Sequence, residues 1–326
     1  MLIGKAGKAR YTYDENGRSI GLDYDCWNEV INSYDKAGNI LSRSIKEPAK
    51  TTNCSYRYDD FYQVTHEGGV AKHSYNFDSL NNRTKKDGKK LKLNKINQLL
   101  NDSNTQYSYD LNGNLTKRAS ATETLSFNYD ALDRLISITS KNKRTTYAYD
   151  AQNRRLSKRV DKKNKLATGW DLGKPYKFLY VGQNDVGSYD DKGNAIELRL
   201  LGLSKGAEIG AAVAVELGGK VYAPLHDHIG NVTALIDAET GKGFEFYRYT
   251  AFGEETLLNE HGEEIDSSIN PWRFSSKRND SETSFVYFGR RYYEPVTGRW
   301  ITPDPLGHAD GLNVYAFVHN RPLTTF

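Results

Sequence analysis

The chain has 326 residues, of which 37% are hydrophobic and 12% aromatic, and 23 of the aromatic residues are tyrosines. Its mean hydropathy is −0.72, and its longest uncharged apolar run, residues 209–215, is far too short to span a bilayer. The composition also argues against a parallel sheet buried on both faces, which needs long aliphatic runs, and against disorder, which is poor in aromatic residues. We therefore expect an all-β protein of antiparallel sheet, with two faces that tolerate polar residues.

Charge is distributed unevenly along the chain. Residues 81–165 hold 20 Lys and Arg against 8 Asp and Glu, a net charge of +12, although the whole chain carries only +4. Seven of these basic residues lie between Arg83 and Lys95. A basic stretch can mark a nucleic-acid surface, but single-strand binding also needs aromatic residues among the charges, and this run has none. We interpret it as a solvated sheet face or an inner wall that contacts a cargo, and do not expect a nucleic-acid partner.

Few residues in the sequence point to a cofactor or a covalent framework. Cys26 and Cys54 are the only cysteines, which excludes a disulfide framework and the usual structural zinc site but leaves a single bridge between them open. The chain contains no phosphate-binding GxxxxGK[ST], no GxSxG and no HExxH, so we expect no cofactor. Residues 1–10 are polar and lack an apolar core, so we expect no Sec-type signal peptide there.

A tandem repeat dominates the first 190 residues. Segments such as YSYDLNGNLT, FNYDALDRLI and YAYDAQNRRL share an aromatic residue followed by aspartate. Successive aspartates are spaced by 21, 24, 19, 32, 20, 20 and 40 residues, a period of about twenty with one stretched and one double-length gap. The repeat aspartates are Asp14, Asp35, Asp59, Asp78, Asp110, Asp130, Asp150 and Asp190.

Each repeat has the pattern of a β-hairpin. Aromatic residues alternate with polar ones, as in Tyr107 and Tyr109, which indicates a strand. The following Asp-x-x-Gly/Asn supplies a side-chain acceptor and a residue that tolerates positive φ, as a tight turn requires, and an apolar residue such as Leu115 begins the next strand. A lone hairpin is marginal in water, whereas stacked hairpins bury their tyrosines against their neighbours.

Tandem repeats with this xYxYDxxGRL pattern resemble those of the rearrangement-hotspot (Rhs) or YD-repeat family, whose relatives include the C components of insecticidal toxin complexes and the teneurins. HDHIGNVTALIDAETG, from His226, is similar to late repeats of that family. PWRFSSKRND, FGRRYYEPVTGRWITPDPLG and NVYAFVHNRP resemble its repeat-associated core segment. The resemblance implies a spiralled ribbon of antiparallel β-hairpins, a shell around a hollow that holds a C-terminal toxin domain.

Length limits how much of such a shell the chain supplies. About thirty strands at roughly 4.8 Å each give a ribbon of about 150 Å, which is about one turn around a toxin-sized hollow. We expect further shell segments, either N-terminal or on partner chains, to complete the enclosure. We divide the chain into a YD-repeat array (1–165), divergent later repeats (166–246) and the repeat-associated core segment (247–326), which ends before a second aspartate motif and the toxin.

Arg291 and Asp304 are the candidate catalytic residues, and the family resemblance identifies them. Family members cleave themselves near the end of the core segment with two carboxylates, as aspartic proteases do. Asp304 in PDPLG then corresponds to one carboxylate, and Arg291 in GRRYYEP to the cation that orients it. The second carboxylate has no counterpart before Phe326, and Asp310 lies in a different motif. The alternative interpretation is a salt bridge that only holds the core segment in place.

Two other patterns suggest metal binding but are better explained as structure. His226 and His228 flank Asp227 and could bind a metal only with a third ligand such as Asp237 or Glu245, for which no motif exists, so we interpret them as turn and ladder residues. The recurrent Asp-x-x-Gly/Asn lacks the alternate carboxylates and terminal Glu of a calcium loop, so we interpret it as turn chemistry.

The sequence is compatible with three hypotheses for the function. The first is a shell or delivery scaffold for a polymorphic toxin, cytoplasmic before export by type VI secretion or a related machine and then secreted or at the cell surface. Its partners would be the toxin domain, other shell segments, secretion components and an immunity protein. The second is an intramolecular aspartic endopeptidase completed by residues after Phe326. The third is a glycan-binding adhesion module that uses exposed aromatic side chains, among them Trp27, Trp170, Trp272 and Trp300.

Overall fold

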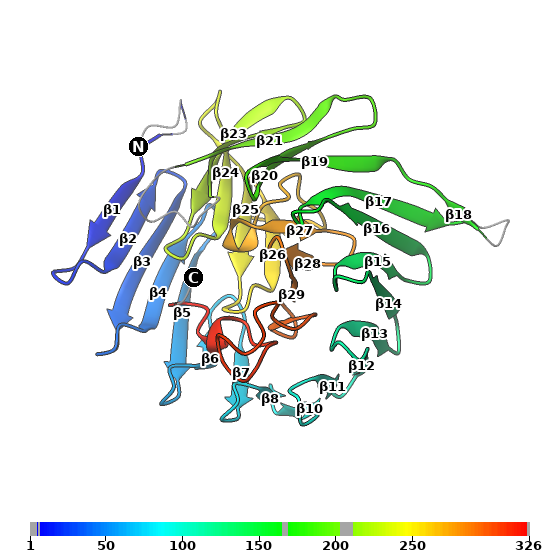
Figure 1. The fold of residues 1–326 in the computed structure, drawn as a ribbon. Helices are drawn as coiled ribbons and strands as arrows, with labels where there is room; N and C mark the ends of the chain where they lie inside the picture. Colours follow the sequence, from blue (N-terminus) through cyan, green and yellow to red (C-terminus); the bar gives the residue numbers. More distant parts are fainter. Residues whose placement is uncertain (1–4, 6, 165–168, 203–210, 325–326) are drawn as a thin grey trace.

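The computed structural model describes residues 5, 7–164, 169–202 and 211–324. These residues form three antiparallel sheets in which nearly every strand pairs with the strand that precedes it in the chain. Figure 1 shows the result, a ribbon of hairpins that curls through about one turn. The predicted all-β fold and the spiralled hairpin ribbon are therefore confirmed.

The first sheet has nine strands. They are β1 (Arg10–Tyr13), β2 (Ser19–Tyr24), β3 (Trp27–Tyr34), β4 (Ile40–Lys46), β5 (Thr51–Tyr58), β6 (Val64–Gly68), β7 (His73–Phe77), β8 (Arg83–Lys86) and β9 (Lys89–Lys90).

The second sheet continues the ribbon with seventeen strands. Those of its first part are β10 (Lys92–Leu93), β11 (Leu99–Asn101), β12 (Thr105–Tyr109), β13 (Leu115–Ser120), β14 (Thr124–Tyr129), β15 (Leu135–Thr139), β16 (Lys143–Tyr149), β17 (Arg155–Lys163) and β18 (Trp170–Asp171). Those of its second part are β19 (Pro175–Val181), β20 (Asn184–Tyr189), β21 (Ala195–Leu201), β22 (Ala212–Leu217), β23 (Lys220–His226), β24 (Val232–Asp237), β25 (Gly243–Tyr249) and β26 (Glu255–Asn259).

A small third sheet lies inside the curl (Figure 1). Its four strands are β27 (Arg278–Asp280), β28 (Phe285–Tyr287), β29 (Tyr292–Glu294) and β30 (Arg299–Trp300). Short 3₁₀ turns, η1 (Phe274–Ser276) and η2 (Val318–Asn320), lie before and after it.

The repeat aspartates make the hairpin turns that their spacing predicts. The Asp150 carboxylate accepts the backbone N–H groups of Gln152 at 2.8 Å and Arg154 at 2.9 Å, and its second oxygen accepts Arg154 Nε at 2.7 Å. The residue between them, Asn153, has a φ of 63°, which Asn tolerates better than most residues. The same two backbone bonds recur at Asp14, Asp35, Asp59, Asp78, Asn94, Asp110, Asp130, Asp190, Asp227 and Asn259.

Asn94 explains the 32-residue gap between repeat aspartates. Its side-chain oxygen accepts the N–H groups of Ile96 and Gln98 at 3.1 and 2.9 Å, and Asn97 adopts a φ of 64°. This turn joins β10 to β11 and lacks the aromatic-aspartate pair, so a search for that pair misses it. The gap therefore contains one divergent hairpin.

The tyrosine before the turn aspartate connects one hairpin to the previous one. The Tyr129 hydroxyl, on β14, donates to the carbonyl oxygen of Leu115, on the preceding strand β13, at 2.8 Å. Equivalent bonds run from Tyr34 to Ser19, Tyr58 to Ile40, Tyr149 to Leu135, Tyr180 to Arg155 and Tyr249 to Val232. We call these bonds the tyrosine latches. They explain why most repeats have tyrosine before the turn aspartate, because phenylalanine, which is found there at Phe77, leaves the carbonyl without this partner.

We expect Tyr129→Phe to lower the free energy of unfolding by about 1–2 kcal/mol, since a partly buried carbonyl loses its donor. Tyr13→Phe is the matched control, because that ring is 59% exposed, and we expect it to change stability by less than about 0.5 kcal/mol. Urea denaturation followed by tyrosine fluorescence measures both. Equal stability of the two variants would contradict the latch.

The ribbon spirals inward, so that its last strands pack within the arc of its first (Figure 1). Side chains of β2–β7 form one buried cluster with those of β23–β26. Phe252 is fully buried there, with its ring centroid 5.0 Å from that of Tyr75. Buried carboxylates of the first sheet add polar contacts, from Glu47 to Arg248 and from Glu67 to the N–H of Ala251. Contacts between residues about 180 to 200 positions apart thus close the turn of the spiral.

The inner face of the ribbon is packed, not bathed in water. Along β5, exposed and buried residues alternate, and the buried face carries Cys54 and Tyr56. The third sheet fills the space inside: Phe285 joins a cluster with β11–β16, and Val286 one with β22–β25. The expectation of two polar-tolerant faces is wrong for this turn of the spiral, because the later strands β23–β26 and the third sheet cover the inner face.

Candidate functional site

Arg291 and Asp304 are in direct contact. Arg291 directly precedes β29, and Asp304 lies in a turn after β30, so the two strands bring together residues 13 positions apart. One guanidinium nitrogen lies 2.7 Å from an Asp304 oxygen, and both side chains are 18% exposed. The Arg291 guanidinium also lies 4.1 Å from the centre of the Trp300 ring, a cation–π distance that holds it in place.

The turn fixes the orientation of the Asp304 carboxylate. Its other oxygen accepts the N–H of Leu306 at 2.9 Å, and its carbonyl accepts the N–H of Gly307 at 2.8 Å. Burial lowers the pKa of Arg291 from its usual value, although Asp304 opposes the shift. The arrangement presents one carboxylate, oriented by a cation and partly open to solvent, as a general acid or base requires.

Asp304 lines a pocket of about 510 Å³ between the core segment and the ribbon. Other lining residues are Asn112, Asn114, Leu132, Asp133, Arg290 and Pro305. Asp133 accepts the side-chain amides of Asn112 and Asn114 at 2.9 and 2.7 Å. Among the described residues Asp304 has no hydrogen bond to a second carboxylate. Asp310 instead lies 3.7 Å from His319 and is 82% exposed.

A buried ion cluster, which the sequence did not predict, anchors the core segment to the ribbon. Asp280 accepts Arg155 at 2.6 and 3.2 Å, Lys158 at 3.1 Å and the Tyr147 hydroxyl at 3.1 Å. Asp280 and Arg155 are both fully buried. The Arg155 guanidinium lies 4.3 Å from the centre of the Tyr287 ring. This cluster fixes the third sheet against β16 and β17.

Further contacts of charged side chains link the core segment to the hairpin ribbon. Arg278 of β27 binds Asp185 of β20, at 2.5 and 3.2 Å, and Arg118 of β13 binds Glu294 of β29. Arg83 of β8 is enclosed by aromatic rings, with its guanidinium 4.1 Å from the centre of the Phe252 ring. Each of the three contacts connects segments that are distant in the sequence.

The C-terminal segment, residues 312–320, lies along the hairpin turns and is held by amide side chains. These bonds join Asn320 to Gln63 at 2.9 Å, Asn313 to Asn82 at 2.8 Å, the Leu312 carbonyl to Asn97 at 3.0 Å and Tyr315 to Gln98 at 3.2 Å. Gln63, Asn82 and Gln98 occupy the turn position that Arg18, Arg134 and Arg154 hold in other repeats, and Gln63 and Asn82 also bind their own aspartate as those arginines do. Asn39 and Asn194 have an amide at the same position and bind their own aspartate too, so an amide alone did not identify the turns that hold this segment.

The His226-Asp227-His228 segment is structural. Asp227 makes the same turn as the repeat aspartates. The His228 ring lies 3.1 Å from both oxygens of Glu29, which joins the turn to β3. His226 is half-buried, and its desolvation together with Arg199 lowers its pKa to about 4. Among the described residues no group of three His, Cys, Asp or Glu side chains could hold a metal ion.

The cysteines, the basic run and two of the tryptophans that the sequence singled out have structural roles. Cys26 and Cys54 are both free, so the single bridge left open by the sequence is not formed. The basic run forms β8–β10, where the first sheet ends and the second begins. Trp27 and Trp272 are each 1% exposed, so the expectation that they serve as exposed glycan platforms is wrong. They pack in the core because the inner face is covered.

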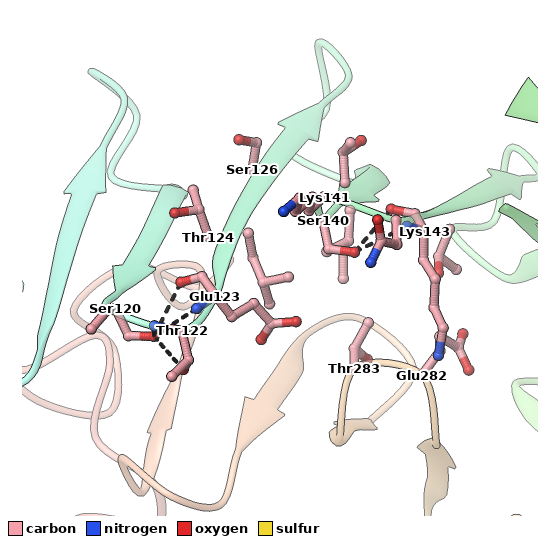
Figure 2. Close-up of a pocket in the computed structure, with 16 residues that line it drawn as sticks. Ser120, Thr122, Glu123, Thr124, Ser126, Ser140, Lys141, Lys143, Glu282 and Thr283 are labelled. Carbon is pink, nitrogen blue, oxygen red and sulfur yellow. Dashed lines mark hydrogen bonds between the residues drawn. The ribbon is translucent and has the colours of Figure 1, made fainter. Parts of the chain in front are cut away.

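A larger pocket, of about 660 Å³, lies between two hairpin loops and the core segment (Figure 2). Hydroxyl groups line it, including Ser120, Thr124 and Ser140. Ser120 Oγ accepts the N–H of Glu123, and Ser140 Oγ accepts the N–H of Lys143, both at 3.1 Å. These hydroxyls thus shape their own loops and do not converge on a reacting atom.

None of the helical turns in the described ranges has the length and apolar character needed to cross a membrane.

Known proteins resemble this chain along nearly its whole length. It is 29% identical to the tRNA nuclease WapA of Bacillus subtilis, over 99% of this chain and 14% of that protein. It is 26% identical to the toxin protein Tse5 of Pseudomonas aeruginosa, over 97% of this chain and 26% of that protein. The chain thus spans about a quarter or less of the length of these two relatives.

The fold also matches a solved structure. The crystal structure of TcdB2-TccC3 superposes with a TM-score of 0.56 and 18% identity, over 97% of this chain and 19% of that one. A family model described as Teneurin YD-shell matches residues 11–323. The chain therefore belongs to the Rhs/YD-repeat family of teneurin-type YD shells.

Proposed function

We propose that the chain is the closing turn of a shell that encloses a C-terminal toxin domain. The observation that carries this proposal is the inward spiral: the hairpin ribbon curls around its own core segment, and residues 312–320 lie across one edge of the ribbon. If further hairpins extended the ribbon beyond this turn, the longer ribbon would form a hollow container. The core segment would close one end of that container. The similarity to a toxin protein and to a tRNA nuclease supports a toxin as the cargo.

The proposal assigns different tasks to the three parts of the chain. Residues 1–165 and 166–246 would form the wall, and residues 247–326 the internal plug that seals it. The protein would be made in the cytoplasm and then exported by type VI secretion or a related machine. An immunity protein would protect the producing cell from the toxin.

We further propose that Asp304 takes part in cleavage that frees the toxin inside the shell. The contact with Arg291 at 2.7 Å supports this role, because a cation beside one carboxylate keeps it ionised and oriented while a second carboxylate carries the shared proton. Asp304 would then activate the attacking water. The second carboxylate would come from outside the described residues.

The experiment expresses the complete open reading frame that contains residues 1–326. We expect two bands on a denaturing gel for the native protein and one uncut band for Asp304→Asn, whereas Asp310→Asn, in the same segment, is cut normally. Cleavage of Asp304→Asn at the native rate would end the protease role but not the shell role. Protease digestion tests the shell: a toxin domain degraded as fast as the free domain would contradict enclosure.

A further inference from the structure

Five successive hairpin turns carry exposed apolar side chains at their tips. They belong to the turns that begin at Asp59, Asp78, Asn94, Asp110 and Asp130. The tip residues are Phe61 (69% exposed), Leu80 (36%), Ile96 (64%), Leu111 (106%) and Leu132 (67%). We call these five residues the tip row.

The tip row is confined to this part of the ribbon. The turns on either side have small or polar residues in the same positions, Lys36 and Ala37 before it and Ala151 and Gln152 after it. Single exposed apolar residues are common on soluble proteins, but exposed apolar residues on five successive turns point to an interaction surface.

Topology places the whole row on one edge. In a ribbon of sequential hairpins the aspartate turns all lie at the same edge, and neighbouring turns are two strands, or about 10 Å, apart. Bonds between turns hold them side by side, from Asn82 to Asn97 at 2.7 Å and from Asn114 to Asp133 at 2.7 Å. Leu312, which is 67% exposed, lies beside the row, because its carbonyl accepts from Asn97.

We propose that the tip row is the contact surface for a second copy of this chain. The row follows the curved edge of the ribbon (Figure 1), so a straight helix or strand could touch only part of it. A second copy has the same spacing and the same curvature by identity. A two-fold axis through the middle of the row would pair the two edges in opposite directions along their full length.

This pairing makes a defined set of contacts. Ile96, the central tip, faces its own counterpart, and Phe61 of one copy faces Leu132 of the other. A strip about 40 Å long and one sheet layer wide removes on the order of 1,000 Å² in total when it pairs, which is the low end for specific interfaces. An interface of this size is typical of a transient contact, so we expect the dimer to dissociate on dilution. The inference is independent of the shell and cleavage proposals.

Sedimentation velocity from low micromolar to several hundred micromolar protein tests the dimer. We expect the native chain to shift from monomer to dimer, and the double variant Ile96→Asp with Leu111→Asp to stay monomeric. Val181→Asp with Leu200→Asp is the matched control, because these side chains are 67% and 65% exposed on other strands, and it dimerises normally. If the first variant unfolds, Phe61→Asp with Leu132→Asp replaces it. A native chain that stays monomeric, or a tip variant that dimerises fully, overturns the proposal.

Cysteine cross-linking tests the geometry in a Cys26→Ser background. We expect Ile96→Cys to form a disulfide-linked dimer with itself, since two-fold symmetry brings the two positions together. Phe61→Cys alone does not cross-link, but it does when mixed with Leu132→Cys. Efficient linkage of Leu200→Cys without linkage of Ile96→Cys would place the contact on another surface and overturn the proposal.

Discussion

Replacing Asp280 with asparagine is expected to lower the free energy of unfolding by about 3–5 kcal/mol, the range for removing one partner of a buried ion pair. Asp280 contacts Arg155 and Lys158, and Arg155 is fully buried. The variant leaves the guanidinium without its compensating charge. Chemical denaturation measures the loss. Asp60→Asn, at an exposed turn tip, is the control and should change stability by less than about 0.5 kcal/mol.

The same ion pair gives the loss a defined pH dependence. Burial raises the pKa of Asp280, but Arg155 and Lys158 outweigh this effect and hold the pKa well below its usual value. Its stabilising contribution is therefore present above the unfolded-state pKa of about 3.9 and is lost as the pH falls below it. We expect the difference in unfolding free energy between the native protein and Asp280→Asn to be constant near neutral pH and to shrink in acid. A gap that widens in acid would contradict this assignment.

Phe252→Ala is expected to lower the free energy of unfolding by about 3–5 kcal/mol, as truncation of a buried phenylalanine does. Phe252 follows β25 and packs between Tyr75 and Arg83 of the first sheet. The variant removes the ring that joins the two ends of the curl. Thermal unfolding measures the loss, and limited proteolysis reports whether the hairpins of the first sheet separate.

Phe61→Ala is the control for the closure. Its ring is 69% exposed, so we expect no change in unfolding free energy beyond about 0.5 kcal/mol. If Phe252→Ala were as stable and as protease-resistant as Phe61→Ala, the curl would not depend on this contact.

The repeat spacing was enough to predict the hairpins, because each turn is determined within five residues. Asp150 and Arg154 form their turn whatever the rest of the chain does. Asn94 escaped notice because asparagine can replace aspartate in the turn and no aromatic residue precedes it. The contact between Arg291 and Asp304 was anticipated from the family motif and is present in the structure.

The packed interior could not be predicted from local pattern. Arg155 and Asp280 are 125 residues apart, and nothing near either residue identifies the other. One local signal did exist: Phe285, Val286 and Tyr287 are consecutive and apolar, which is typical of a strand buried on both faces. The expectation of two polar-tolerant faces ignored that signal.

The tyrosine latches make the wall modular in evolution. A latch joins a hairpin to its immediate predecessor, as Tyr129 does to the Leu115 carbonyl, so a gene could gain or lose units of about twenty codons in regions held by latches alone. The row of amides from Gln63 to Gln98 cannot tolerate such changes, because each amide matches one residue of the C-terminal segment. Duplications and deletions should therefore accumulate in one part of the ribbon and be purged from the other.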